Sequence, residues 1–319
     1  MKVAAGRGMK VDRLVDVRTV IAHGREEGPC ADGLVAALIV KDVLPRVAIR
    51  FVSNGSVELR ELAAEPGLLF VDIAPPAARV GEFLAAGALV LDHHASAREL
   101  VAMFRDRGAG AYSAEPGVSA ALLAFREVWE PIKFKLWEPS SSGLGRSHAL
   151  RVAELVGIHD THLTEDPSWD EARRLVAVLF FYEDWLVIDQ PLLALRRRLE
   201  LGPTLVEKQR ASVARAVAQS GRLTTPKGTS VAVVPTTYLI SDVVDAVDVD
   251  VVVGFAFAVR AGVPSMKLSF RSRRGRYNVR EIAEALGGGG HDAAASVWIE
   301  LHASHRHPYA TIRTLMEMW

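Results

Sequence analysis

The stretch LVLDHHASA, residues 89–97, changes within three positions from an apolar run to one carboxylate and two imidazoles, Asp92, His93 and His94. Aspartate is rarely buried without a partner, and polar side chains clustered in a core are costly unless something satisfies them. The run before Asp92 has the length and composition of a buried strand. The stretch therefore predicts a strand that delivers three polar side chains to one edge of a sheet.

Strand and helix patterns alternate around this stretch. Strand-like runs occur at 19–24, 48–54, 68–74 and 88–94, and runs with helical spacing lie between them at 31–44, 56–65 and 75–87. Such alternation is typical of parallel strands covered by helices on both faces. The first part of the chain is therefore predicted to be an α/β domain with a parallel sheet.

The pattern becomes helical from about residue 117 and returns to strands after Gly221. The last helical run, 192–220, is long, charged and poor in large apolar groups toward its end, which is typical of a connecting helix. We predict an N-terminal domain over 1–190, a helical linker over 191–221 and a smaller α/β domain over 222–319. Minor expectations are a flexible loop at 138–147, a loop at 287–290 and a final amphipathic helix at 307–319.

The composition restricts the class of protein. The 319 residues include 38 basic and 38 acidic side chains, so the formal net charge is zero, which argues against bulk electrostatic binding of long nucleic acid. One cysteine, Cys30, excludes an intrachain disulfide framework and favours a reducing compartment. The N-terminus has no signal-peptide core, and acidic residues interrupt the apolar stretch 175–195. We therefore expect a cytoplasmic protein without membrane contact.

The polar residues at the strand ends predict a metal site. In open α/β sheets, ligands bind at the carboxyl ends of the strands. His23, Asp72 and the tripeptide starting at Asp92 each follow a strand-like run, and Asp32 opens the helix after the first strand. If the strands are parallel, all of these side chains converge on one rim. Carboxylates and imidazoles without a cysteine pair suit manganese, magnesium or a similar divalent ion.

Other polar residues have a plainer interpretation. A single Asp or His at the end of an element is more often a helix cap or a loop residue than a ligand. We interpret His159 and His162, which flank Asp160 in GIHDTH, mostly in this way. The arginine run at 196–198 is interpreted as a solvated helix face.

A second candidate site lies in the C-terminal domain. Four glycines at 287–290 precede His291, and a helix interior would not tolerate them, at about 1 kcal/mol each relative to Ala. Glycines allow close approach of a ligand to the backbone, whose N–H groups can hold an anion. Arg271 on the preceding strand is a natural phosphate partner. We predict substrate binding by Arg271, Gly288, Gly289, Gly290 and His291.

Taken together, these motifs resemble the DHH phosphoesterase superfamily, in the branch with a glycine-rich DHH-associated C-terminal domain. The motifs are LDHH at 91–94, FVDIAPP at 70–76, CADG at 30–33, SFRS at 269–272 and GGGGH at 287–291. The branch includes RecJ exonucleases, nano-RNases and phosphatases acting on 3′-phosphoadenosine 5′-phosphate. The resemblance covers nearly the whole chain and implies two divalent ions, usually manganese, with hydrolysis in a cleft between the domains.

The resemblance also implies roles for individual residues. Asp72 corresponds to the carboxylate that bridges two ions, which implies a two-metal in-line attack by water. Asp32, His93 and Asp160 correspond to the remaining ligands of one ion. His94 corresponds to the residue that contacts the scissile phosphate or assists the leaving group. We therefore expect His94, His93 and Asp72 to be the catalytic residues.

The other ion site departs from the family pattern. His23 corresponds to one of its ligands, but Cys30 stands where the pattern has its first Asp, and the interval from His23 is longer than usual. A thiolate ligand would shift the site toward softer ions. Glu27, four residues after His23, is the alternative ligand, and an incomplete site with a single metal remains a third interpretation.

The expected function is a metal-dependent phosphodiesterase or phosphomonoesterase. Zero net charge and modest length favour short single-stranded oligonucleotides or small phosphorylated nucleotides over long strands, which need a continuous positive groove. One alternative is a RecJ-like single-strand exonuclease. Another is a catalytically degenerate DHH protein that acts as a nucleic-acid or protein binding module. The sequence leaves a homodimer open.

Overall fold

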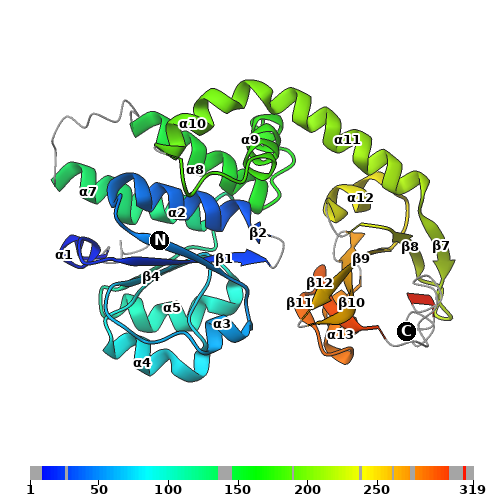
Figure 1. The fold of residues 1–319 in the computed structure, drawn as a ribbon, viewed down its shortest axis with the longest axis horizontal. Helices are drawn as coiled ribbons and strands as arrows, with labels where there is room; N and C mark the ends of the chain where they lie inside the picture. The colour runs from blue at the N-terminus through cyan, green and yellow to red at the C-terminus, as the bar shows by residue number, and fades with distance from the viewer. Residues whose placement is uncertain are drawn as a thin grey trace, which may run out of the picture. The chain divides into compact units, whose positions relative to one another are not determined.

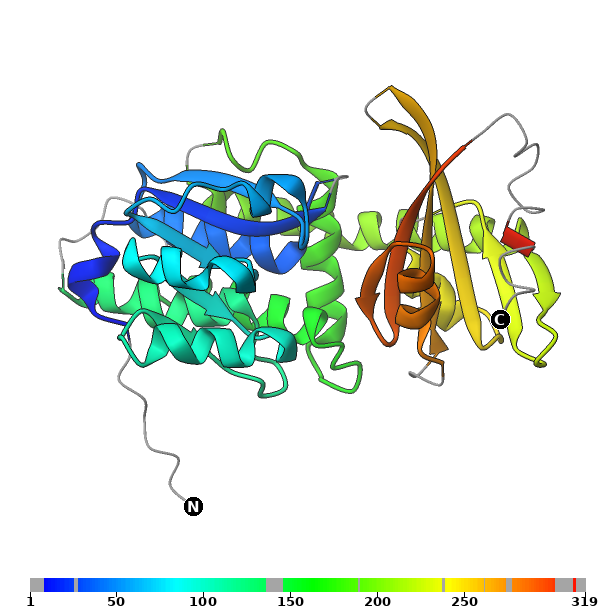
Figure 2. The same cartoon turned by 90° about the horizontal axis from the view of Figure 1, so that it is seen from below.

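In the computed structural model, the chain consists of two compact units, Met1–Val206 and Glu207–Trp319 (Figures 1 and 2). The structure describes residues 9–25, 28–135, 146–188, 190–236, 239–260, 262–273, 277–301 and 312–313. The expected loop at 138–147 lies mostly outside these residues, as does most of the expected helix at 307–319. No helix among the described residues is both long and apolar enough to cross a membrane.

A parallel sheet forms the centre of the first unit. Its strands are β1 (Thr19–Arg25), β3 (Ala48–Val52), β4 (Leu68–Val71), β5 (Leu89–Asp92) and β6 (Gly110–Tyr112), with the short β2 (Gly28–Pro29) antiparallel to the end of β1. The parallel strands lie in the order β3-β1-β4-β5-β6. The chain order reverses between β1 and β4, so this pair of strands is the topological switch point, where α/β sheets bind ligands.

Helices cover both faces of this sheet. Figure 1 shows α2 (Ala31–Val43) on one face and α3 (Val57–Arg60), α4 (Val80–Ala85) and α5 (Arg98–Arg105) on the other. A short helix, α1 (Val11–Leu14), precedes the sheet. The ten residues from Ala31 to Val40 are all buried, because α2 packs against β1 and also against the helices that follow the sheet. A helix enclosed in this way is apolar all round rather than on one stripe.

A helical layer completes the first unit. It consists of α6 (Ala120–Ala124), a π-helical segment (Phe125–Trp129), α7 (Glu130–Lys135), α8 (Arg146–Asp160), α9 (Trp169–Phe181) and α10 (Pro191–Arg198). Leu192 and Leu195 of α10 belong to the core of this unit. A 3-10 turn over Leu199–Leu201 separates α10 from α11 (Gly202–Ala218), so the run predicted as one long helix consists of two.

The second unit contains a six-stranded sheet in the order β11-β12-β10-β9-β8-β7. The strands are β7 (Gly221–Thr224), β8 (Ser230–Val234), β9 (Val251–Arg260), β10 (Val263–Ser272), β11 (Gly289–His291) and β12 (Ala294–Glu300), and only β8 and β9 are parallel. In β8, Val231 and Val233 pack in one cluster with α13 (Val279–Ala285), whereas Ala232 and Val234 pack in another with α12 (Ile240–Ala246). This period of two places one helix on each face.

The observed elements confirm the α/β fold class and correct several local predictions. The helix predicted over 56–65 has only the four residues of α3, and strands β2, β6 and β7 were not predicted. The glycine run is not simply a loop. Gly287 adopts a left-handed conformation, with φ of 82°, and the chain then enters strand β11 at Gly289. Strand pairing with β12 therefore overrides the usual preference of consecutive glycines for irregular structure.

Candidate metal centre

The polar residues of the first unit meet at the switch point of the sheet. His23 lies near the end of β1, Asp72 follows β4 directly, and His93 and His94 follow β5. Asp72 has φ of 61°, a left-handed backbone conformation that is uncommon for residues other than glycine and better tolerated by Asp and Asn. Its backbone N–H donates to the carbonyl of Leu91 at 2.9 Å, which extends the pairing of β4 with β5 by one residue. The turn therefore holds the Asp72 carboxylate in a fixed place.

Asp72 is the centre of the cluster, and its side chain is only 3% exposed. Its Oδ2 lies 2.9 Å from Cys30 Sγ and 3.4 Å from His23 Nδ1. Its Oδ1 lies 3.3 Å from His93 Nε2 and 3.7 Å from His94 Nδ1. The two carboxylate oxygens thus face two different sets of ligand atoms, His23 and Cys30 on one side and His93 and His94 on the other.

His93 connects Asp72 to two further carboxylates. Its Nε2 lies 3.5 Å from Asp32 Oδ2 and 3.3 Å from Asp160 Oδ2. Asp32 is completely buried, whereas Asp160, at the end of α8, is 36% exposed. One imidazole between three carboxylates indicates an environment built for positive charge.

Asp32 is fixed by the first turn of α6. Its Oδ2 and Oδ1 each accept a hydrogen bond at 2.8 Å, from the backbone N–H groups of Ala120 and Ala121 respectively. These N–H groups have no partner within a helix, and the helix dipole favours a negative charge beside them. Asp32 therefore keeps one orientation even though it lies in the second position of its own helix, α2.

His94 has a separate carboxylate partner. Its Nδ1 lies 2.8 Å from Asp92 Oδ1, and the same oxygen accepts the backbone N–H of His94 at 2.9 Å. The carboxylate holds the hydrogen on Nδ1, and this orients the opposite ring nitrogen, Nε2. Asp92 itself is buried.

The charges and hydrogen bonds of the cluster shift the pKa values of its groups in opposite directions. Burial acts to raise the pKa of Asp72, but hydrogen bonds from His23 and His93 outweigh it and hold that pKa well below the usual range. Burial acts to lower the pKa of His93, but the hydrogen bond to Asp72 and the charges of Asp32 and Asp160 raise it to about 9. In the absence of a cation, His93 therefore carries a proton at neutral pH.

Burial dominates at three other groups. It raises the pKa of the Cys30 thiol well above its usual value, and the neighbouring carboxylate of Asp72 raises it further. Burial also raises the pKa of Asp32 and of Asp160, and the negative charge of Asp72 adds to both effects. These carboxyl groups are crowded, and a divalent cation among them would relieve the repulsion that raises their pKa values.

The donor set fits divalent metal ions. Three groups of ligand atoms, in each of which all the atoms lie within 4.8 Å of one another, are His23–Cys30–Asp72, Asp72–His93–His94 and Asp32–His93–Asp160. Asp72 and His93 are each shared by two groups. The acidic, imidazole and thiol groups here could therefore hold a metal, and the sequence-predicted ligands of the first unit all lie in this cluster. Glu27, the alternative to Cys30, lies outside the described residues.

Three features of the centre were not predicted from the sequence. Cys30 caps α2, and its Sγ accepts the Gly33 N–H at 3.2 Å. Asp92 orients His94, and the start of α6 holds Asp32. The LDHH motif already contained Asp92, but the contribution of α6 arises from a contact across 88 positions of sequence, for which the sequence has no local signal.

His159 is more than a cap residue, because it stacks on Trp169 with ring centroids 5.5 Å apart.

The predicted substrate residues lie in the second unit. Arg271, on β10, donates from Nε to Ser241 Oγ on α12 at 3.3 Å. Gly289 pairs with Ser296 of β12, and His291 pairs with Ala294. Gly288 approaches β12 so closely that a Cβ there would lie 2.3 Å from the carbonyl oxygen of Ser296. The lack of a side chain at Gly288 thus allows close packing against β12.

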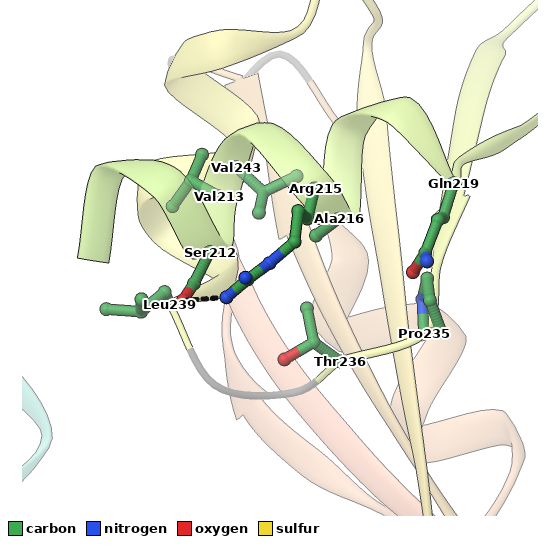
Figure 3. A pocket seen from close by; sticks show the side chains of 9 residues that line it. All are labelled: Ser212, Val213, Arg215, Ala216, Gln219, Pro235, Thr236, Leu239 and Val243. Atoms are coloured by element: carbon green, nitrogen blue, oxygen red, sulfur yellow. Dashed lines mark hydrogen bonds between the residues drawn. The ribbon is translucent and has the colours of Figure 1, made fainter. Parts of the chain in front are cut away.

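The second unit also has an open pocket of about 210 Å³ between α11 and α12 (Figure 3). Figure 3 shows Arg215 extending along the pocket toward Ser212, and its Nη2 donates to Ser212 Oγ at 3.2 Å. The nine lining residues include one cationic side chain and no carboxylate or imidazole. This pocket has neither metal-ligand chemistry nor any of the predicted site residues.

Comparison with known proteins supports the fold. No family model and no curated protein matches the sequence. Among solved structures, the DHH domain of a protein from a family of ribosomal proteins is 12% identical, with a TM-score of 0.51 over 96% of this chain and 87% of that chain. A pGpG-specific phosphodiesterase from Vibrio cholerae is 15% identical, with a TM-score of 0.43 over 94% and 98%. An exopolyphosphatase-related protein from Bacteroides fragilis is 10% identical, with a TM-score of 0.45 over 96% and 94%.

At these identities the likeness concerns the fold and says nothing of substrates. The match to the DHH-domain structure covers 96% of this chain, so it extends over both units. The chain therefore shares the fold of this DHH-domain structure.

Proposed function

We propose that this chain is a metal-dependent phosphoesterase that hydrolyses short oligonucleotides or small phosphorylated nucleotides. The observation that carries the proposal is the arrangement around Asp72, whose two carboxylate oxygens face separate sets of ligand atoms. A buried carboxylate shared in this way is the basis of a two-ion site for phosphoryl chemistry.

The proposed ligands are divided between two ions, most suitably manganese. Asp32, His93 and Asp160 hold one ion, His23 and Cys30 hold the other, and Asp72 bridges them. Such ions supply a water nucleophile at neutral pH and neutralise charge on the phosphoryl oxygens. The protein contributes the fixed positions of the ligands, since Asp72 is held by its turn and Asp32 by the start of α6.

His94 is proposed to assist the leaving group. Burial acts to lower its pKa, but the hydrogen bond and charge of Asp92 outweigh this effect and raise it. Asp92 therefore favours the protonated form of His94. As water adds to phosphorus and the bond to the leaving oxygen breaks, the imidazolium donates a hydrogen bond or a proton to that oxygen.

The second unit is proposed to bind the part of the substrate that does not react. Arg271 offers a planar guanidinium for a phosphate, and the backbone of Gly288, Gly289 and Gly290 can approach an anion closely. We assign His291 to the same site because it directly follows these glycines. Zero net charge favours a short substrate over a long strand.

The test is a hydrolysis panel in manganese, with dinucleotides, longer RNA, single-stranded DNA and 3′-phosphoadenosine 5′-phosphate as substrates. The matched variant is Asp72→Asn, because Asn tolerates the left-handed backbone and preserves the size of the side chain. We expect hydrolysis of the short substrates, and a loss of kcat/KM of about 1,000-fold or more in Asp72→Asn with loss of bound metal.

Other outcomes would point to the alternatives. Rates that rise with strand length would support a RecJ-like exonuclease. Binding of nucleic acid without hydrolysis of any substrate would support a degenerate binding module. Full activity in a folded Asp72→Asn protein would contradict the metal centre itself.

A further inference from the structure

The thiol of Cys30 makes one of the two candidate ion sites unlike the other. His23, Cys30 and Asp72 bring a ring nitrogen, a sulfur and a carboxylate oxygen within 4.8 Å of one another, and we call this group the thiol site. Thiolate and imidazole ligands suit zinc better than manganese. Catalytic zinc sites usually have three protein ligands, whereas structural zinc sites have four. The thiol site therefore has the ligand types and the ligand number of a catalytic zinc site.

The backbone holds the Cys30 sulfur in this position. Sγ accepts the backbone N–H of Gly33 at 3.2 Å and lies 2.9 Å from Asp72 Oδ2. A Cβ on Gly33 would lie 3.1 Å from this sulfur and would collide with the carbonyl oxygen of His23, so a larger residue does not fit beside the thiol. Cys30 is also the N-cap residue of α2, where the Gly33 N–H and the helix dipole favour a thiolate once an ion replaces the thiol proton. The sulfur is thus fixed beside Asp72.

The other site consists mainly of carboxylates. Asp32, Asp72 and Asp160 each place a carboxylate oxygen within 3.5 Å of His93 Nε2, and we call these four residues the carboxylate site. Manganese and magnesium are hard ions that prefer oxygen ligands. Asp32 cannot turn to suit a different ion, because backbone N–H groups of α6 hold both of its oxygens. The carboxylate site therefore favours a harder ion than the thiol site does.

We propose that the metal centre holds two different ions, zinc in the thiol site and manganese in the carboxylate site. This inference rests on the proposed function and names the ions of the same centre. Asp72 suits both ions, because its Oδ2 faces Cys30 and its Oδ1 faces His93. Cys30 is then the residue that makes the two sites unequal, and an aspartate in its place would make them similar.

The order in which ions fill the two sites tests this inference. Zinc binds most protein sites more tightly than manganese does, so tight zinc binding alone would not distinguish them. The full chain is freed of metal with EDTA, dialysed, and titrated with cobalt(II), a spectroscopic substitute for zinc whose charge-transfer band with thiolate lies in the near ultraviolet. A second sample receives one equivalent of zinc and then excess manganese. Its bound metals are counted after equilibrium dialysis, and its manganese is studied by electron paramagnetic resonance.

We expect the thiol site to fill first. The first equivalent of cobalt should give the full charge-transfer band, and the second should add little to it. The mixed sample should contain one zinc and one manganese per chain. Manganese beside zinc, which is diamagnetic, should give the spectrum of an isolated ion, whereas two manganese ions that share Asp72 should give a spin-coupled spectrum.

Two variants separate the ligand from the helix cap. Ser and Asp are both good N-cap residues, so Cys30→Ser and Cys30→Asp preserve the start of α2. Both should abolish the cobalt charge-transfer band. Cys30→Asp should also lower the preference of this site for zinc over manganese by at least about tenfold, because oxygen replaces sulfur. Asp160→Asn is the matched control in the carboxylate site, and it should lose manganese but keep zinc and the cobalt band.

The outcomes distinguish this inference from the proposed function. Absence of the charge-transfer band from the folded wild-type chain overturns the inference, even where the chain hydrolyses its substrates with two manganese ions. A spin-coupled manganese pair that persists after one equivalent of zinc also overturns it. One zinc and one manganese in a chain that hydrolyses nothing supports the two different ions and overturns the phosphoesterase proposal instead. If the Cys30 variants do not fold, the wild-type band and metal count still decide.

Discussion

At the scale of single residues, the metal centre is a set of groups that compete for protons. His93 lies within 3.5 Å of three carboxylates, and they raise its pKa to about 9 in spite of its burial. A protonated imidazole cannot ligate a metal, so a bound ion must displace this proton. If His93 ligates an ion as proposed, metal binding and proton release are the same event at this residue.

This competition gives the pH dependence of metal affinity a definite sign. Below about pH 9 the proton on His93 opposes the ion, and the opposition weakens as the pH rises toward that value. We expect manganese affinity to increase continuously from about pH 6 to about pH 9, by about tenfold per pH unit if one proton is displaced. Calorimetry in buffers of different ionisation enthalpy measures the protons released. A pH-independent affinity would show that His93 is not a ligand.

Cys30 is the residue at which the sequence departs from the DHH motif pattern that it otherwise resembles. Its thiol lies 2.9 Å from Asp72, and burial raises its pKa, so the thiolate is scarce until a cation replaces the proton. In EDTA we expect slow alkylation of Cys30 that accelerates only at high pH, and in manganese we expect protection at every pH. We also expect Cys30→Ser to lose metal from the site with His23.

Metal counting on Cys30→Ser and Glu27→Gln distinguishes the two possible ligands. Equal alkylation rates with and without manganese, together with two bound ions and full activity in Cys30→Ser, would contradict a thiolate ligand. Loss of one ion in Glu27→Gln alone would assign the position to Glu27.

At the scale of elements, close contacts between backbones place the ligands. Gly157 in α8 packs against the turn at Gly117 so tightly that a Cβ would lie 2.2 Å from the Gly117 carbonyl oxygen. The Thr161 hydroxyl, just after α8, accepts the N–H of Gly117 at 3.0 Å. This contact fixes the end of α8, where Asp160 faces the metal centre.

We expect Gly157→Ala to lower the free energy of unfolding by about 1–3 kcal/mol through overpacking, and to weaken metal binding because Asp160 moves with the helix. Gly81→Ala is the control. Gly81 lies in α4, and no atom lies within 4 Å of a Cβ placed there. Since Ala favours a helix over Gly, this change should leave stability unchanged or raise it by up to about 1 kcal/mol. Chemical denaturation of both variants and calorimetry with manganese provide the measurements.

The long elements could be predicted from the sequence, whereas contacts between distant segments could not. The apolar runs before Asp72 and Asp92 have clear strand patterns, and their polar ends predicted the rim where ligands gather. The four-residue helix α3 and the two-residue strand β2 are too short for a periodic signal. The hydrogen bonds from α6 to Asp32 join residues 88 and 89 positions apart and depend on how the helices pack.

At the scale of the whole molecule, the two units carry different chemistry. The first unit has the buried carboxylates and imidazoles, and the second has Arg271 and the glycine strand β11. If the second unit only holds the substrate, changes there should affect KM and spare the bond-breaking step. The domain boundary predicted between residues 190 and 221 is close to the division after Val206, although α10 packs in the first unit.

We expect Arg271→Ala and His291→Ala each to raise KM about 10- to 100-fold, the effect of losing one charge-assisted phosphate contact, with kcat within about threefold. Steady-state kinetics with a dinucleotide in manganese provides the measurement, and Arg222→Ala, on the exposed edge strand β7, is the control. A fall in kcat with unchanged KM would place these residues in the reacting centre.

Two protons in the centre determine how the protein responds when metal is lost and returns. One lies between Cys30 and Asp72, and the other is on His93 among the carboxylates. In the absence of metal, the protons on Cys30 and His93 hydrogen-bond to Asp72 and keep the ligands together. We therefore expect loss of metal to leave the fold intact and the centre organised. If the chain is the proposed phosphoesterase, it would regain activity without refolding once divalent ions become available. Its activity would then rise and fall with the concentration of free divalent metal.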